Sequence, residues 1–210
     1  MFGIINYKLF ILSSILLNLT PGSDTIYILG KGISKGKKAA IISALGISVG
    51  CLVHTILAAF GLSAVLSKSI LAFNIVKWIG AIYLIHLGIK SFKSKGFSLE
   101  ETTNENTIPL KKIFTEGILT NVLNPKVALF FLSFMPQFIA QDNNHGALPF
   151  LILGFTFVVS GTIWCQILAI SSSLMTKKLK ENPRISDRLN KITGIVFVAL
   201  GIKLVTTKHQ

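Results

Sequence analysis

Charge is scarce in this chain, and acidic charge is the scarcest. Charged residues make up 14% of its 210 residues, and 8 Asp or Glu stand against 21 Lys or Arg. Soluble domains contain about 25% charged residues, so an ordinary water-soluble globule is disfavoured. The hydrophobic content of 51% also excludes a disordered chain. An integral membrane protein remains, because about 20 apolar residues form a helix that crosses about 30 Å of hydrocarbon.

Cysteine is rarer still. Cys51 and Cys165 each lie in an apolar stretch without a CxxC pair, which disfavours a disulfide framework, a zinc site and a membrane thiol relay. The Walker loop, the dinucleotide-binding fingerprint, HExxH and GxSxG are also absent from the sequence. We therefore expect no enzyme, no cofactor and no resident metal, and an ATP-driven pump would need a partner chain.

Long apolar runs account for most of the sequence. They cover residues 9–30, 39–66, 70–89, 113–135, 147–175 and 192–205. The sixth run is the weakest because Lys203 shortens it, so five spans is the alternative to six. We expect one multi-pass membrane domain over residues 1–210.

Basic residues are concentrated in alternate links between the runs. Fifteen of the 21 lie within residues 31–38, 90–112 and 177–191. Short basic loops stay in the cytoplasm, so we expect both termini outside. The net charge of +13 is then a signal of topology, with the lipid bilayer as partner and no nucleic acid. Anionic headgroups are expected near these lysines.

The third and sixth runs repeat one sequence pattern. Residues 77–90 read KWIGAIYLIHLGIK and residues 191–203 read KITGIVFVALGIK. Both open on Lys-x-x-Gly and close on Leu-Gly-Ile-Lys. The pattern indicates an internal repeat of three helices, with chance resemblance between Lys-flanked, Gly-containing helices as the alternative.

The first and fourth runs share an interruption. Residues 18–22 read NLTPG and residues 121–125 read NVLNP, and proline removes a backbone donor from a helix. Broken helices in matching positions are typical of secondary transporters built from inverted repeats. The sequence predicts an all-α integral membrane protein with six transmembrane helices in two inverted three-helix repeats, in which helices 1 and 4 are interrupted. The repeats are residues 1–90 and 113–210, and a cytoplasmic linker covers 91–112.

A charged residue follows each interruption near mid-span. Asp24 follows the first and Lys126 the second. A charge at a helix centre costs about 2.5–3.5 kcal/mol, so it normally faces a cavity or a partner. We hypothesise that the two side chains approach each other and bind the ammonium and carboxylate of a zwitterion, or exchange protons; a fixed internal ion pair is the alternative. The residues predicted to bind substrate or to gate are Asn18, Pro21, Gly22, Asp24, Asn121, Asn124, Pro125 and Lys126.

Other polar or small residues in the runs favour structural roles. Glu116 lies near the start of the fourth run and is expected at the interface. His54 and His86 are single histidines on apolar helices, which favours packing over a proton relay. Gly46 and Gly50 form a GxxxG pair, which predicts close helix packing.

Three separated motifs resemble those of one family. Residues 18–24, NLTPGSD, resemble the Thr-Pro-Gly-Pro-Asp signature of the LysE/RhtB family of amino-acid exporters (LysE-type translocators). Residues 77–88 resemble the third-helix pattern of that family, and residues 117–138 resemble its fourth-helix block. Ser23 departs from the signature, which usually has a second proline there. The resemblance implies an exporter of amino acids or their derivatives in the cytoplasmic (inner or plasma) membrane, driven by protons or the membrane potential.

The residues and the resemblance together predict secondary active efflux of a small amino-acid-like substrate, by alternating access of two inverted halves. A homodimer is compatible with the small chain and its packing glycines. The alternative is an exporter of a metal cation or another small solute, which the scarcity of span carboxylates (Asp24 and Glu116) disfavours. A non-transporting membrane scaffold would not need Asp24 and Lys126 at mid-span.

Overall fold

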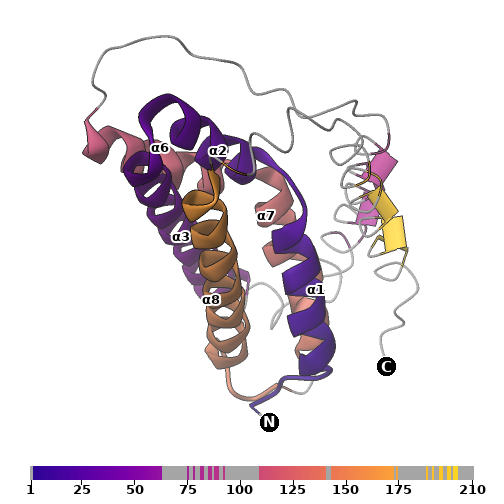
Figure 1. The fold of residues 1–210 in the computed structure, drawn as a ribbon. Coiled ribbons are helices and arrows are strands. Elements are labelled where there is room, and N and C mark those ends of the chain that lie inside the picture. The colour runs from indigo at the N-terminus through magenta and orange to yellow at the C-terminus, as the bar shows by residue number, and fades with distance from the viewer. Residues whose placement is uncertain are drawn as a thin grey trace.

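The computed structural model describes residues 2–62, 109–140 and 143–172, together with single positions between 75 and 92 and between 174 and 202. Most of the predicted linker and of the third and sixth spans lies outside the described residues. The described chain is helical, apart from turns and an isolated antiparallel bridge between Ile4 and Ile139. Figure 1 shows its main helices, α1, α2, α3, α6, α7 and α8.

The first broken helix consists of α1 (Tyr7–Leu19) and α2 (Ser23–Lys35), which meet at a bend of 45°. Thr20 caps α1 with an extended backbone, at φ −68° and ψ 119°, as is usual before a proline. Pro21 has no N–H with which to continue the helix, and Gly22 is extended as well, at φ −157°. The interruption predicted within residues 18–22 is confirmed.

The second broken helix consists of α6 (Leu110–Val122) and α7 (Pro125–Leu129), which meet at a bend of 44°. Asn124 caps α7, because its Oδ1 accepts a hydrogen bond from Lys126 N at 3.0 Å. Pro125 takes the first helical position, where an N–H would have no helical partner. The predicted interruption is again confirmed. The chain then continues through a π-helical turn and a 3-10 turn, η2 (Phe130–Phe134) and η3 (Met135–Phe138).

The remaining two helices are uninterrupted. α3 (Lys37–Leu57) continues into a π-helical turn, η1 (Ala58–Leu62), and α8 covers Leu148–Ile170. Within the described residues these two are long and apolar enough to cross a membrane, and each broken pair adds a candidate if it forms one span. The described structure is thus an all-helical membrane domain with two to four candidate spans.

α3 and α8 lie side by side and run in opposite directions (Figure 1). Thr162 Oγ1 on α8 donates a hydrogen bond to Ser48 Oγ on α3 at 2.8 Å. Further along α3, Thr55 lies against Gly154, which precedes Thr162 on α8. The two long helices therefore form an antiparallel pair.

α3 and α6 run parallel and pack through glycines. A Cβ added to Gly117 would lie 2.8 Å from Ser43 O and 3.3 Å from Gly46 Cα. Further along both helices, a Cβ added to Gly50 would lie 2.7 Å from Asn121 Cβ. The close packing predicted from Gly46 and Gly50 is confirmed, and it brings Asn121 against α3.

The described positions of the third and sixth predicted spans also lie together. A Cβ added to Gly88 would lie 2.9 Å from Gly194 O, and one added to Gly201 would lie 3.0 Å from Ala81 O. The residue numbers fall along one segment as they rise along the other, so the segments run antiparallel. These glycines belong to the motif repeated in residues 77–90 and 191–203.

Phenylalanines fill the bundle between α1, η2, η3 and α8. The ring centroid of Phe130 lies 4.7 Å from that of Phe157 and 5.8 Å from that of Phe10. Phe10 also lies 5.2 Å from Phe138. Leu17, near the end of α1, instead contacts Lys126 on α7, so α1 runs antiparallel to the segment from α7 to η3. The four phenylalanines, called the aromatic cluster below, fill the bundle on the side of the two breaks where the N-terminus of the chain lies (Figure 1).

Candidate functional site

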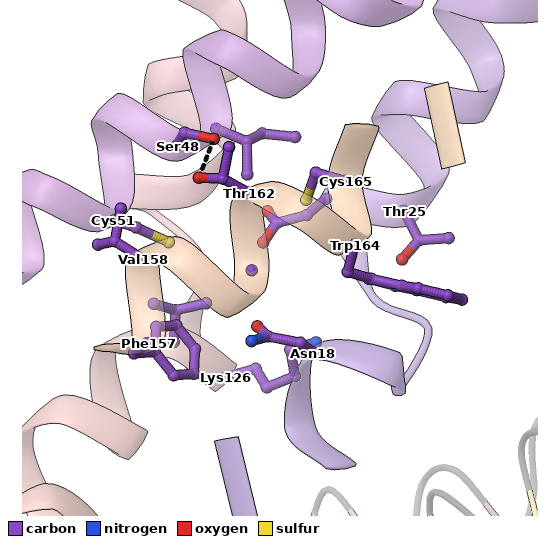
Figure 2. A pocket seen from close by; sticks show the side chains of 14 residues that line it. Asn18, Thr25, Ser48, Cys51, Lys126, Phe157, Val158, Thr162, Trp164 and Cys165 are labelled. Carbon is purple, nitrogen blue, oxygen red and sulfur yellow. Dashed lines mark hydrogen bonds between the residues drawn. The ribbon is translucent and has the colours of Figure 1, made fainter. Parts of the chain in front are cut away.

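The two breaks place one acid and one base at matching positions. Asp24 is the second residue of α2, and Lys126 is the second residue of α7. Both line one cavity, which also borders α3 and α8 (Figure 2). The structure therefore brings together the two charged residues that the sequence analysis selected.

Lys126 reaches from one broken helix to the other. Its Nζ donates to Thr20 O at 3.0 Å and to Leu17 O at 3.4 Å. These carbonyls lie at the end of α1, where a helix leaves carbonyls unpaired and has the negative end of its dipole. Gly22 leaves room for the ammonium group, since a Cβ there would lie 3.2 Å from Nζ.

Asp24 is held from α6. Its Oδ2 accepts a hydrogen bond from Asn121 Nδ2 at 2.9 Å, and its place in the first turn of α2 sets it at the positive end of that helix dipole. Asn121 is fully buried, and its main-chain O lies 3.1 Å from His54 Nε2 on α3. His54, interpreted from the sequence as a packing residue, therefore links α3 to the site.

Asp24 and Lys126 share the cavity without forming an ion pair with each other. The carboxylate contacts a side-chain amide, and the ammonium contacts main-chain carbonyls. The described structure thus has no ion pair between these two residues, and each charge has its own hydrogen-bond partners.

Four polar atoms around the breaks are buried without a hydrogen-bond partner in the described part of the chain. Two are acceptors, Asp24 Oδ1 and Asn121 Oδ1, and two are donors, Asn124 Nδ2 and Trp164 Nε1. Buried polar atoms are nearly always paired, so unpaired ones need an explanation. A ligand that carries an ammonium and a carboxylate would supply partners of both kinds.

The remaining predicted site residues shape the breaks. Asn18 also lines the cavity, and its Nδ2 donates to Ser160 Oγ on α8 at 3.1 Å. Pro21 and Pro125 interrupt the two helices, and Asn124 caps α7.

The cavity is small. Its volume is about 20 Å³, which is room for about one water molecule and too little for an amino acid. The described conformation is therefore closed around the site. Its lining consists of Asn18, Asp24, Thr25, Ile47, Ser48, Cys51, Lys126, Val127, Phe157, Val158, Gly161, Thr162, Trp164 and Cys165.

Sequence reasoning missed the wall that α3 and α8 contribute. Ser48, Thr162 and Trp164 line the cavity, as do both cysteines (Figure 2). Hydroxyl side chains in these apolar runs were only a weak sequence signal for a polar site, because Ser and Thr in a helix commonly donate to the carbonyl four residues earlier. Ser48 does so here, donating to Ala44 O, although it also accepts a hydrogen bond from Thr162.

A second polar group lies where α2 ends and α6 begins. Lys31 Nζ and Glu116 Oε2 form an ion pair at 2.9 Å. Tyr27 OH, as donor, lies 2.7 Å from Ile113 O and 3.1 Å from Glu116 Oε2. Tyr27, Lys31 and Glu116, called the polar cluster below, join the two broken helices on the side of the site opposite the aromatic cluster. Glu116, expected at the interface, thus also connects the two halves.

The chain resembles known membrane proteins along nearly its whole length. Residues 15–208 match the family model described as LysE type translocator. The membrane protein YrhP of Bacillus subtilis is 35% identical over 193 residues, which cover 88% of this chain and 91% of that protein. A membrane protein of Vibrio cholerae is 31% identical over 200 residues, which cover 95% of this chain and 96% of that protein. The leucine efflux protein of Salmonella typhimurium is 28% identical over 205 residues, which cover 98% of this chain and 97% of that protein. No solved structure gives a significant match.

Proposed function

Because the chain belongs to the LysE type translocator family, we propose that it exports an amino acid from the cytoplasm by secondary active transport. The observation that carries this proposal is the placement of one acid and one base at matching positions of two broken helices, beside a shared cavity. The proton gradient or the membrane potential is the proposed driving force, and the transport step needs no cofactor.

The substrate binds as a zwitterion between the two charges. Its ammonium group donates to Asp24 Oδ1 and Asn121 Oδ1, which are buried acceptors without partners. Its carboxylate accepts from Asn124 Nδ2 and from Lys126 Nζ, which turns from the carbonyls at the end of α1. Hydrogen bonds between charged groups are about twice as strong as neutral ones, so both ends of the zwitterion contribute to affinity.

The proposed substrate is a neutral aliphatic amino acid, and leucine is the first to test. The charged side chains that line the cavity are Asp24 and Lys126, and the zwitterion engages both, so no charge is left for a charged substrate side chain. Ile47, Phe157 and Val158 supply an apolar lining. Relatives 28% and 29% identical to this chain are named leucine efflux proteins.

Transport proceeds by alternating access of two inverted halves, residues 1–90 and 113–210, joined by the linker 91–112. The opposite directions of the two broken helices and of α3 and α8 support this arrangement. Basic residues at positions 35–38 and 111–112 lie on the side of the polar cluster, and basic ends stay in the cytoplasm. Separation of the polar cluster then admits substrate, and separation of the aromatic cluster releases it outside.

Exchange of labelled leucine by proteoliposomes preloaded with leucine tests the proposal. The competitors are 4-methylpentanoate, which lacks the ammonium group, and 3-methylbutylamine, which lacks the carboxylate. Each should compete at least about tenfold more weakly than leucine, because each leaves a buried charged group unpaired. Equal competition by either compound would contradict recognition of a zwitterion.

Export of a metal cation, the alternative considered from the sequence, has no specific support. Within the described residues, no three His, Cys, Asp or Glu side chains gather as metal ligands would. Zinc or manganese flux through proteoliposomes that exchange no leucine would reverse this preference.

A further inference from the structure

His54 is a buried titratable side chain that the proposed transport step does not use. It lies on α3 with 7% of its surface exposed, and its Nε2 is 3.1 Å from the main-chain O of Asn121. A carbonyl oxygen can only accept, so Nε2 carries the hydrogen and donates it. The contact is a directed hydrogen bond from α3 to the end of α6.

The bonded carbonyl lies at the second break. Asn121 O also accepts a hydrogen bond from Asn124 N at 2.9 Å, in the turn where α6 ends. Beyond the break, the ring of Phe131 stacks on the His54 imidazole, with centroids 5.6 Å apart and planes at 26°. His54 thus contacts the chain before and after the break, and it holds α6 and η2 in one relative arrangement.

Asn121 passes this constraint to Asp24. Its main chain accepts from His54, and its side-chain Nδ2 donates to Asp24 Oδ2 at 2.9 Å. Gly50, one turn before His54 on α3, confines the same residue, since a Cβ there would lie 2.7 Å from Asn121 Cβ and 2.9 Å from its Oδ1. With both its carbonyl and its Cβ fixed, Asn121 holds one oxygen of Asp24 and leaves the other, Oδ1, unpaired.

We propose that His54 is a positioning residue, which acts through Asn121 to aim the Asp24 carboxylate at the ammonium group of the substrate. The inference rests on the proposed function. The Nε2 donor of His54 is committed to Asn121 O, and His54 itself does not line the cavity, so we place it behind Asn121 and not against the substrate. Its loss should therefore weaken recognition of the ammonium group and leave recognition of the carboxylate, at Lys126, unchanged.

Leucine exchange by proteoliposomes tests the proposal with four variants. His54→Phe keeps an aromatic ring against Phe131 and lacks the donor, whereas His54→Gln carries an amide N–H near the position of Nε2. His54→Asn has an amide too short to reach Asn121 O, and it replaces His54→Phe if that variant does not fold. Thr55→Val is the matched control. Thr55 is the neighbour of His54 on α3 and is also buried, and the substitution leaves the side-chain volume nearly unchanged.

We expect His54→Phe to raise both the KM for leucine and the inhibition constant of 3-methylbutylamine about fivefold, the equivalent of one neutral hydrogen bond. Inhibition by 4-methylpentanoate should not change, and His54→Gln and Thr55→Val should behave as wild type. Equal weakening of both competitors, or a lower maximal rate at a normal KM, would show a structural role only and overturn the proposal. If the wild-type protein exchanges no leucine, the proposed function itself fails, and the inference fails with it.

Discussion

The two broken helices carry opposite charges at the same position, and they hold these charges in different ways. Lys126 is anchored by the main-chain carbonyls of Thr20 and Leu17, which any residue at those positions would supply. Asp24 is anchored by the side-chain amide of Asn121, which in turn depends on contacts with α3. The acidic half of the site should therefore be the more sensitive to substitutions that do not touch the cavity.

The largest fall in leucine exchange should come from placing a lysine at position 24 as well as at position 126. In Asp24→Lys the substrate ammonium meets two like charges, and one uncompensated charge at mid-membrane costs about 3 kcal/mol, so leucine exchange should fall about a hundredfold. The double exchange Asp24→Lys with Lys126→Asp should recover only part of the activity. An amide donor faces position 24 and carbonyl acceptors face position 126. The new ammonium group would therefore meet a donor, and the new carboxylate would meet acceptors. Full recovery would show that the two breaks are interchangeable.

The next largest effect should come from Gly50→Ala. The new Cβ would lie 2.7 Å from Asn121 Cβ, so the substitution should lower the free energy of unfolding by about 1–3 kcal/mol and raise the KM for leucine. The matched control is Gly30→Ala on α2, where a new Cβ meets no atom within 4 Å. Thermal unfolding in detergent and leucine exchange measure both properties. Equal behaviour of the two variants would contradict the role given to the contact between α3 and Asn121.

A smaller effect is expected at the basic half. In Gly22→Ala the new Cβ would lie 3.2 Å from Lys126 Nζ, which is the end of a flexible side chain that can move by a few tenths of an ångström. The KM for leucine should rise less than about threefold, which corresponds to less than about 0.7 kcal/mol. A loss as large as that of Gly50→Ala would reverse the order of sensitivity of the two halves.

The smallest effect on stability is expected at the polar cluster. The side chains of Lys31 and Glu116 are 17% and 35% exposed, so solvent partly screens the pair, and screened surface pairs contribute about 0–1 kcal/mol. Glu116→Gln should lower the free energy of unfolding by less than about 1 kcal/mol, and high salt should remove the difference from wild type because it screens the pair. Thermal unfolding at low and high ionic strength checks this. A salt-independent loss of several kcal/mol would show that the cluster supports the fold.

The breaks and the charges beside them could be predicted from the sequence for physical reasons. Proline has no N–H for a helix, and a charge such as Asp24 or Lys126 is conspicuous in an apolar run. The partners of these charges could not be predicted, because a single sequence does not show which face of an apolar helix points inward. His54 and Asn121 are 67 residues apart in the chain, and their contact arises only when α3 packs along α6. The cavity wall from α8 was missed for the same reason.

In the proposed mechanism, Asp24 and Lys126 together bind the two charges of an amino acid. The most direct test is efflux of labelled leucine from proteoliposomes, with and without an imposed pH gradient and membrane potential, for the wild type, Asp24→Asn and Lys126→Gln at equal amounts of folded protein. We predict gradient-dependent efflux by the wild type, and efflux at least about tenfold slower by each variant, because each loses one charge-assisted contact to the substrate. Efflux at the wild-type rate by either variant would contradict this mechanism.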